Sequence, residues 1–571
     1  MSGFSVWAPY AGQVEIEIGG KRYRMRPGRA PGWWRAEVPE ARHGTDYVFR
    51  LDGGEPLPDP RSPWQPHGVH GPSRFVDHSA FPWTDRGWTG RPLPGGVVYE
   101  LHIGTFTPEG TFDAAIGRLD HLVDLGVTHV EVMPVNAFPG RHGWGYDGVG
   151  LWAVHDPYGG PDGFKRFVDA CHGRGLAVIL DVVYNHLGPG GNYLARFGPY
   201  FTDRGHTPWG PAVNLEGSDE VRRFVVENAL YWLREYHVDG LRLDAVHALV
   251  DTRRLLEELV VQVEALATAQ NRPLTLIAES DPSDPRLVTP REAGGYGLHA
   301  QWSDDFHHAL RSLLTGERHG YHGDCEPLPA LAKALTGGHD ASTFRARRHG
   351  RPVDTRTTPA HRFVCYLQNH DQVGNRAAGD RLSATLRPEP LKIGAALLLT
   401  APFTPMLFMG EEWAASTPWQ YFTDHPEPEL AQAVREGRRA ESAGWDPTAV
   451  PDPQDERTFQ RSKLDWREKD RDEHAAVLRW YRRLIALRRR YPQLADPWLD
   501  RVHVVYDEES RWLVVSRGRL RVAVNLSPEP RKIPLDAIPV GVCAVSVPGF
   551  VFDRWGIRLA PESVAVVETL G

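Results

Sequence analysis

The chain has 571 residues, 65 of them basic and 73 acidic, which gives a formal net charge of −8 at pH 7. At roughly 150 residues per domain, this length predicts several domains or one large barrel with attached modules. Hydrophobic residues make up 41% and charged residues 24% of the chain. This balance excludes a mainly disordered chain, and the acidic net charge without long basic runs argues against a nucleic-acid partner.

The cysteines and the apolar stretches indicate the compartment. The four cysteines lie far apart without a CxxC spacing, which predicts neither a zinc knuckle nor a disulfide scaffold. Residues 1–9 contain neither a basic nor an apolar leader segment. Residues 393–410 are apolar over about the length of a membrane span, but prolines interrupt them, so we interpret them as a buried helix followed by a buried strand. We therefore expect a cytoplasmic protein with no membrane segment.

Residues 1–92 alternate short β-like runs with Gly, Pro and Asp turns, which is the pattern of a small antiparallel β-sandwich. The candidate strands span residues 13–18, 34–38 and 47–51. A proline-rich stretch at 57–64 indicates the exit from this module. We expect residues 1–92 to be the first domain.

Residues 93–492 alternate apolar runs with amphipathic helical stretches, as the chain does around a parallel sheet. The strand candidates span residues 97–103, 129–133, 176–183, 238–244, 274–279, 298–302, 363–368 and 406–409. Helical stretches include 112–125, 219–235, 252–269, 304–314 and 473–490. Eight such units predict a (β/α)₈ TIM barrel with insertions, whose active site lies on the loops after the strand carboxyl ends.

Residues 493–571 return to short alternating strands at 502–506, 512–516, 520–525 and 563–568. They predict a C-terminal antiparallel β domain. The expected fold class is therefore α/β: a TIM barrel between an N-terminal β-sandwich and a C-terminal β domain.

Polar side chains crowd the ends of four predicted barrel strands. The third ends at Asp181 to His186, the fourth places Arg242 and Asp244 on one side of the strand, and the fifth ends at Glu279. The seventh leads into the segment 369–371. A single strand-end carboxylate is equally well explained as a helix cap or an ion pair. Four such strand ends in barrel order instead favour an active site. Burying charged groups at the mouth of a barrel costs free energy, which a role in binding or catalysis would explain.

Two carboxylates facing each other across a sugar are the minimal machinery for glycoside hydrolysis. The segments 181–186, 240–244, 279 and 369–371 resemble, in order and spacing, the four signature regions of the α-amylase family of retaining glycosidases. Residues 4–9 resemble the carbohydrate-binding-like β domain that precedes the barrel in branching, debranching and trehalose-releasing members. The resemblance implies intracellular α-glucan metabolism without a cofactor.

The resemblance also implies a role for each matching residue. Asp244 is expected to be the nucleophile, Glu279 the general acid and base, and Asp371 the stabiliser of the transition state through the sugar 2- and 3-hydroxyls. Arg242 is expected to hold Asp244 ionised and aimed. The further expected substrate contacts at these strand ends are His186 and His370 on the sugar ring, Asn369, and Tyr146 as a stacking platform with Asp147 as its polar partner.

The segments 65–71, 302–308, 369–375 and 408–425 resemble the trehalose-releasing branch of the family. That branch cleaves the α-1,4 bond next to the terminal trehalose unit of maltooligosyltrehalose and acts together with a maltooligosyltrehalose synthase. The resemblance implies maltooligosyltrehalose and related α-glucans as substrates. We expect the leaving-group side to be formed after the sixth, seventh and eighth strands by Asp304, Asp305, His307, Gln372, Glu412 and Trp413.

Three alternatives remain open at this point. A glycogen branching enzyme would share the chemistry until a sugar hydroxyl, instead of water, intercepts the ester at Asp244. A catalytically silent glucan-binding protein would be expected to lack one of the three carboxylates, and all three are present. A metal-dependent hydrolase is disfavoured because neither HExxH nor a clustered ligand set appears. In α-amylases the Asn at the position of Asn185 helps bind calcium, but the loop 187–215 is short, so we interpret Asn185 as orienting the catalytic residues and predict no metal.

Overall fold

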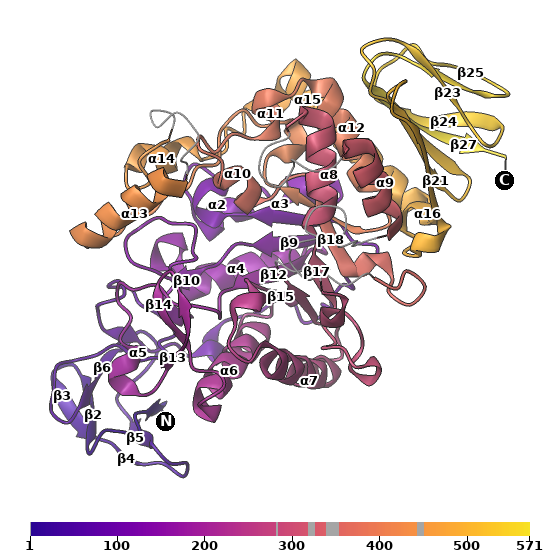
Figure 1. The fold of residues 1–571 in the computed structure, drawn as a ribbon. Coiled ribbons are helices and arrows are strands. Elements are labelled where there is room, and N and C mark those ends of the chain that lie inside the picture. The colour runs from indigo at the N-terminus through magenta and orange to yellow at the C-terminus, as the bar shows by residue number, and fades with distance from the viewer. Residues whose placement is uncertain (1, 281–283, 318–325, 338–352, 442–449, 571) are drawn as a thin grey trace.

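A computed structural model describes residues 2–280, 284–317, 326–337, 353–441 and 450–570. A closed barrel of parallel strands lies at the centre, and the N-terminal and C-terminal sheets lie at opposite ends of the molecule (Figure 1). The fold class predicted from the sequence is confirmed.

The barrel strands coincide with the eight predicted apolar runs, and each strand pairs in parallel with its neighbours. Around the barrel the order is β8 Val98–Leu101, β9 His129–Val132, β12 Ala177–Val182, β15 Gly240–Leu243, β16 Thr275–Ala278, β17 Ala300–Trp302, β18 Phe363–Tyr366 and β19 Thr404–Phe408.

Helices lie between the barrel strands and after the last of them, outside the barrel (Figure 1). The longer ones are α4 Gly160–His172, α6 Asp219–Glu235, α7 Thr252–Gln270, α8 Asp304–Thr315, α9 Pro327–Gly337, α12 Pro388–Thr400, α13 Pro428–Glu441 and α15 Asp472–Arg490. The predicted helix 112–125 is two helices, α2 Phe112–Ile116 and α3 Leu119–Leu125, because α2 ends at Gly117. Residues 393–410 form the end of α12 followed by β19, as predicted. Within the described ranges, no helix has the length and apolarity that crossing a membrane requires.

The N-terminal strands form two antiparallel sheets. One contains β1 Ser2–Trp7, β5 Trp33–Val38 and β4 Arg26–Pro27, and the other contains β3 Lys21–Arg24, β2 Val14–Ile18, β6 Asp46–Leu51 and β7 Ser73–Arg74. Phe4, Val14, Ile16 and Phe49 are buried in this part of the core. Buried and half-buried residues alternate along β2 and β6, which agrees with the short β-like runs that predicted them.

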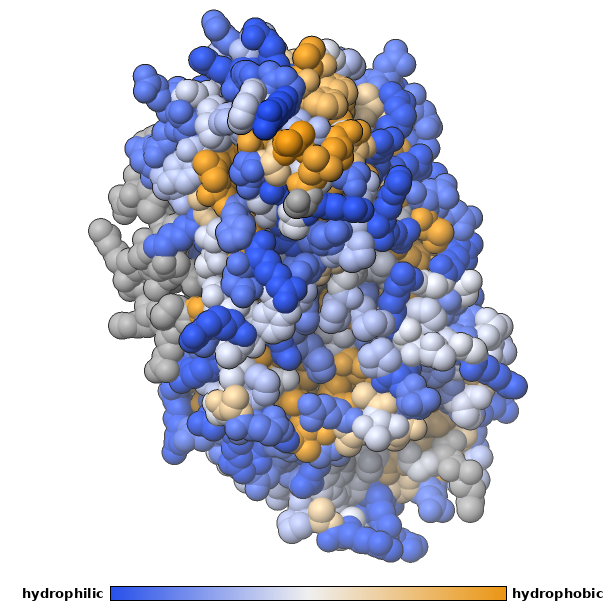
Figure 2. Space-filling model, turned by 90° about the vertical axis from the view of Figure 1, so that its right-hand side faces the viewer, coloured by the Kyte–Doolittle hydropathy of each residue, from blue (hydrophilic) through white to orange (hydrophobic). Residues whose placement is uncertain are grey.

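The C-terminal strands also form two sheets. Five of them, β20 Val502–Asp507, β21 Trp512–Arg517, β22 Leu520–Asn525, β27 Ser563–Thr569 and β24 Pro539–Val545, pair in that order; β23 Arg531–Pro534, β26 Gly556–Leu559 and β25 Val551–Asp553 form the second sheet. Exposed apolar residues gather at the top of the face shown in Figure 2, on the side of these sheets, and the exposed large hydrophobics of this part include Val540 and Val551. The domain boundaries 1–92, 93–492 and 493–571 stay predictions.

The interior of the barrel has an apolar floor below a polar layer. Val98, Ile179 and Ile277 are buried together in the floor. Two residues further along the same strands or just beyond them come Glu100, Asp181 and Glu279. Since side chains on one face of a strand recur every second residue, each carboxylate points into the barrel directly above an apolar side chain.

A buried ionic cluster closes the opposite end of the barrel. His172, at the end of α4, contacts Asp85 through Nδ1 and Asp239 through Nε2, each at 2.9 Å. The indole of Trp88 stacks on the His172 ring, and its Nε1 donates to Asp239. Burial would lower the pKa of His172, but its bonds to Asp239 and Asp85 raise it. The cluster connects the segment 85–88, which precedes the first barrel strand, to Asp239, directly before β15, the strand that carries Arg242.

We expect His172→Gln to lower the thermal unfolding midpoint, because it removes the buried cation shared by Asp85 and Asp239, which then keep only His237 and Arg272 respectively as basic partners. The pKa of His172 is raised above 6.5, so its contribution is fully present below that pH and is lost as the pH rises through the raised pKa. The loss of midpoint should therefore be larger at about pH 6 than at about pH 9. His503→Gln, at an exposed position on β20, is the control, and an equal loss at both pH values would contradict a charged His172.

Candidate active site

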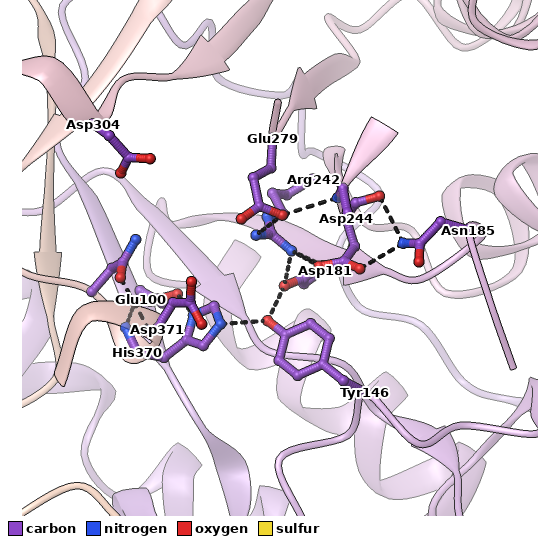
Figure 3. Close-up of polar contacts among 12 residues, drawn as sticks. Glu100, Tyr146, Asp181, Asn185, Arg242, Asp244, Glu279, Asp304, His370 and Asp371 are labelled. Carbon is purple, nitrogen blue, oxygen red and sulfur yellow. Dashed lines mark hydrogen bonds and ion pairs between the residues drawn. The ribbon is translucent and has the colours of Figure 1, made fainter. Parts of the chain in front are cut away.

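One buried guanidinium organises the polar layer. The Nη1 atom of Arg242 donates to both oxygens of Asp181, at 2.9 and 2.8 Å, and to Oδ1 of Asp244 at 2.9 Å. Its Nη2 atom lies 2.8 Å from Oε2 of Glu279 (Figure 3). The Arg242 side chain is 1% exposed, and its Cζ lies 4.1 Å from the ring centroid of Trp302. Three carboxyl groups from adjacent strands therefore share one cation.

Asp244 is held in its ionised form. Burial would raise the pKa of Asp244, but the attraction of Arg242 and of His186 lowers it below its ordinary value. Asn185 contributes a hydrogen bond from Nδ2 to Oδ2 of Asp244 at 2.7 Å. This carboxylate therefore remains negative at neutral pH.

Glu279 has the opposite protonation state. Burial raises its pKa to about 8, against the attraction of Arg242, and the negative charges of Asp244 and Asp371 raise it further. The backbone N–H of Ala245 donates to Oε2 of Glu279 at 2.9 Å and fixes the side chain. At neutral pH the site thus contains one protonated carboxyl group and one ionised carboxylate. The two lie next to each other, since Arg242 contacts both.

A chain of hydrogen bonds connects this pair to the first barrel strand. The hydroxyl of Tyr146 donates to Oδ2 of Asp181 at 2.6 Å and lies 2.9 Å from Nε2 of His370. On its other side, His370 forms an ion pair through Nδ1 with Glu100, which also accepts the His370 backbone N–H at 2.9 Å. Burial would lower the pKa of His370, but Glu100 raises it. The Tyr146 and His370 rings stack, with centroids 5.2 Å apart.

Asp371 lies in the first turn of α10 His370–Gly374. Burial raises the pKa of Asp371, against the attraction of His370. In Figure 3, Asp371 and Asp304 lie on one side of the site, and Asp244 with Asn185 lies on the other. The structure thus brings the three predicted catalytic carboxylates, Asp244, Glu279 and Asp371, into one cluster.

Three residues that were predicted to contact substrate form hydrogen bonds to other protein groups instead. The Oδ1 atom of Asn369 accepts from the backbone N–H groups of Asp371 and Gln372, at 3.1 and 3.0 Å, so Asn369 caps α10. The ring nitrogens of His186 contact Oδ1 of Asn185 and the backbone oxygen of Tyr146. Both ring nitrogens of His370 contact Tyr146 and Glu100, as described above. These side chains position their neighbours.

Asp147 also differs from its expected arrangement. It was expected as the polar partner of Tyr146, but its Oδ2 atom lies 3.6 Å from Nε2 of His425, and the hydroxyl of Tyr146 is bonded to Asp181 instead. Burial raises the pKa of Asp147.

On the expected leaving-group side, the structure brings Asp304 and Gln372 together. Oδ1 of Asp304 accepts from Nε2 of Gln372 at 2.9 Å and from the hydroxyl of Tyr366 at 2.7 Å. Both residues are partly exposed. The Oε1 atom of Gln372 is itself buried, with no hydrogen-bond partner among the described residues. It is therefore a buried acceptor without a partner among the described residues, next to Asp304.

The other predicted leaving-group residues do not open onto the site, and this corrects the sequence-based prediction. Glu412 is fully buried and accepts from the hydroxyl of Tyr99, while Nε2 of His121 lies 2.7 Å away. Trp413 is also fully buried and packs against His121 and Trp466. Asp305 and His307 are buried on α8, where Nδ1 of His307 bonds to the backbone oxygen of Leu367.

Several site residues were missed as functional candidates. Glu100 orients His370, and the signal was an acidic residue inside the first apolar run. Glu131 of β9 pairs in register with Glu100 and is buried with no hydrogen-bond partner in the described part of the chain. Burial raises its pKa well above the usual range, so Glu131 is neutral. Across the ranges that the structure covers, no group of three or more His, Cys, Asp or Glu residues is arranged to hold a metal.

Known proteins match this chain over nearly its whole length. Residues 72–198 match the alpha-amylase catalytic domain, and residues 497–566 match a domain of unknown function, DUF3459. The malto-oligosyltrehalose trehalohydrolase of Rhizobium sp. (strain M-11) is 53% identical, over 99% of this chain and 97% of that protein. The chain belongs to the malto-oligosyltrehalose trehalohydrolase family.

Two further comparisons agree with this membership. The malto-oligosyltrehalose trehalohydrolase of Arthrobacter ramosus is 56% identical, over 93% of this chain and 94% of that protein. A crystal structure of a putative alpha amylase from Salmonella typhimurium is 39% identical, with a TM-score of 0.90, and the match covers 100% of this chain and 97% of that one. The resemblance inferred from the strand ends is confirmed.

Proposed function

We propose that the protein is a retaining α-glycosidase that hydrolyses the α-1,4 bond next to the terminal trehalose unit of maltooligosyltrehalose. The products are trehalose and a maltooligosaccharide. The single observation that carries this proposal is the contact of one guanidinium with two carboxyl groups in opposite protonation states, Asp244 and Glu279. The trehalohydrolase relatives, matched along both chains, favour this reaction over glucan branching and over a silent glucan-binding protein.

In the first step, a carboxylate oxygen of Asp244 attacks the anomeric carbon while Glu279 gives its proton to the departing glycosidic oxygen. The bond to trehalose breaks and a glycosyl ester forms on Asp244. In the second step, Glu279 takes a proton from water, the water oxygen attacks the anomeric carbon, and Asp244 leaves as a carboxylate. Two displacements retain the anomeric configuration. Asp371 would bind the 2- and 3-hydroxyls of the transferred sugar.

The electrostatics of the site support this change of role. The negative charge of Asp244 raises the pKa of Glu279, and that charge disappears when the ester forms. The pKa of Glu279 should then fall, so that the carboxylate left after proton donation remains ionised and acts as the base. Arg242 contacts both groups and stabilises whichever one carries the charge.

We also propose that the protein acts after a maltooligosyltrehalose synthase, in the cytoplasm. The substrate has a non-reducing end group that another enzyme must build before this one removes it. The described cysteines, Cys171, Cys365 and Cys543, are free thiols, which suits a reducing compartment; Cys325 lies outside the described residues.

Incubation of the protein with maltooligosyltrehalose should release trehalose, and Asp244→Asn should lower kcat by at least about 10³-fold because no neighbouring group replaces an aligned carboxylate. Trehalose is measured by chromatography, and the anomeric configuration of the new reducing end by NMR. Asp120→Asn, an exposed position on α3, is the matched control.

Two outcomes would contradict this proposal. Near-wild-type turnover by Asp244→Asn would remove the nucleophile from the mechanism. New α-1,6 branches in amylose, detected by iodine staining and branch analysis, without release of trehalose, would assign the protein to the branching enzymes.

The pH profile of kcat/KM should have a basic limb near pH 8, because the pKa of Glu279 is about 8 and the acid must be protonated in the free enzyme. Activity is lost as the pH rises through that value. Glu279→Gln should remove the basic limb together with most of the activity, whereas Glu257→Gln on α7 should leave the profile unchanged. An unaltered limb in Glu279→Gln would transfer the acid role to another group.

Gln372→Ala should reduce kcat/KM for maltooligosyltrehalose by about tenfold or more, because a hydroxyl of the trehalose unit loses its buried acceptor. Hydrolysis of plain maltooligosaccharides should change much less. Glu412→Gln is the control of choice, since Glu412 is buried behind β19: it should lower the unfolding midpoint and leave the ratio between the two substrates unchanged. Equal losses on both substrates in Gln372→Ala would place the selectivity elsewhere.

A further inference from the structure

A groove separates helix α15 from strand β24 of the C-terminal sheet. Two adjoining cavities of about 430 and 400 Å³ form it, and both are lined by Arg483, Val542 and Cys543. The groove shares no lining residue with the carboxylate cluster of the active site. Its volume is that of a pocket for a small molecule.

The groove is strongly basic. Arg479, Arg483 and Arg490 line it from α15, and Lys392 lines it from α12. None of these four side chains forms an ion pair with another described residue. Glu568 is the one carboxylate among the described lining residues, and it is already paired with Arg519 at 3.1 Å. Four basic residues without a described ion-pair partner therefore line the groove, against one carboxylate that is already paired.

Helix stability does not explain this arrangement. Basic residues near a helix carboxyl terminus interact favourably with its dipole, which accounts for the last turn of α15, but Arg479 and Arg483 lie earlier in the helix. Two like charges four residues apart destabilise a helix. Arg483 also donates to the backbone oxygen of Cys543, so one of these cations is fixed at the wall of the groove.

We propose that the groove binds a small phosphorylated metabolite that carries at least two negative charges. Arginine forks match phosphate oxygens in pairs, and Arg479 and Arg483 project from successive turns of one helix. Lys392 and Arg490 provide charge on the flanks. The opposite wall contains Val542, Ala544 and Phe550, which suits the organic part of such a ligand. The ligand bridges the barrel and the C-terminal sheet.

Calorimetric titration of the whole protein with inorganic pyrophosphate and with ATP, at about 0.15 M salt, tests the proposal. If the phosphate groups alone are sufficient for binding, both pyrophosphate and ATP should bind saturably at one site. If the organic part of the ligand is also needed, ATP should bind and pyrophosphate should not. Arg479→Gln with Arg483→Gln should weaken binding by at least about tenfold. Arg439→Gln, an exposed position on α13, should have no effect. Trehalose release should be unchanged in both variants.

The reactivity of Cys543 locates the site. Its thiol is partly exposed in the groove, and alkylation by iodoacetamide is followed by peptide mass spectrometry. The bound ligand should slow alkylation of Cys543 in the wild type and not in the double variant. The charge-conserving pair Arg479→Lys and Arg483→Lys should give intermediate affinity, which controls for loss of folding. Three results would each overturn the proposal: no saturable binding of either ligand, binding without protection of Cys543, or full affinity in the double glutamine variant.

Discussion

The active site depends on the burial of one arginine. Arg242 is removed from water inside the barrel, and such a charge is tolerated only when its hydrogen bonds and counter-charges are supplied by the protein. Arg242 donates hydrogen bonds to both carboxylate oxygens of Asp181 and to one oxygen of Asp244, and the ring face of Trp302 covers the guanidinium. Strand pairing places Asp181 directly opposite Arg242. The register of two neighbouring strands therefore fixes the cation around which the other groups are arranged.

The carboxyl groups around this cation differ in protonation state. A cluster of acids in a low-dielectric barrel cannot ionise completely, because like charges raise one another's pKa. Arg242 and the hydrogen bond from Asn185 lower the pKa of Asp244, so Asp244 stays ionised. Burial and neighbouring negative charges raise the pKa of Glu279 and Glu131, so these two remain neutral. The difference between an acid and a nucleophile thus arises from electrostatic balance: the attraction of Arg242 and His186 outweighs burial at Asp244, whereas burial and the negative charges of Asp244 and Asp371 outweigh the attraction of Arg242 at Glu279.

Much of the fold and of this cluster could be predicted from the sequence, because both follow from periodicity. Each barrel strand is an apolar run of the right length, and Ile179 and Ile277 precede Asp181 and Glu279 by two residues. That spacing puts the carboxylates on the inward face as soon as the runs are recognised as parallel strands. Glu100 follows the same rule two residues after Val98, but the predicted apolar run continues to residue 103, so Glu100 is not recognised as a carboxylate at a strand end.

The leaving-group side could not be predicted in this way, because the direction of the chain after a strand depends on local backbone geometry. After β18, Asn369 caps α10 at once, and the first helical turn presents Asp371 and Gln372 to the site. After β19, Gly410 adopts a φ of 82° and a 3₁₀ turn carries Glu412 back into the core. There, Tyr99 and His121 hold its carboxylate from positions far away in the sequence. Two polar segments at equivalent strand ends thus point in different directions. The helix cap at Asn369 directs one segment to the site, and the left-handed glycine Gly410 directs the other into the core.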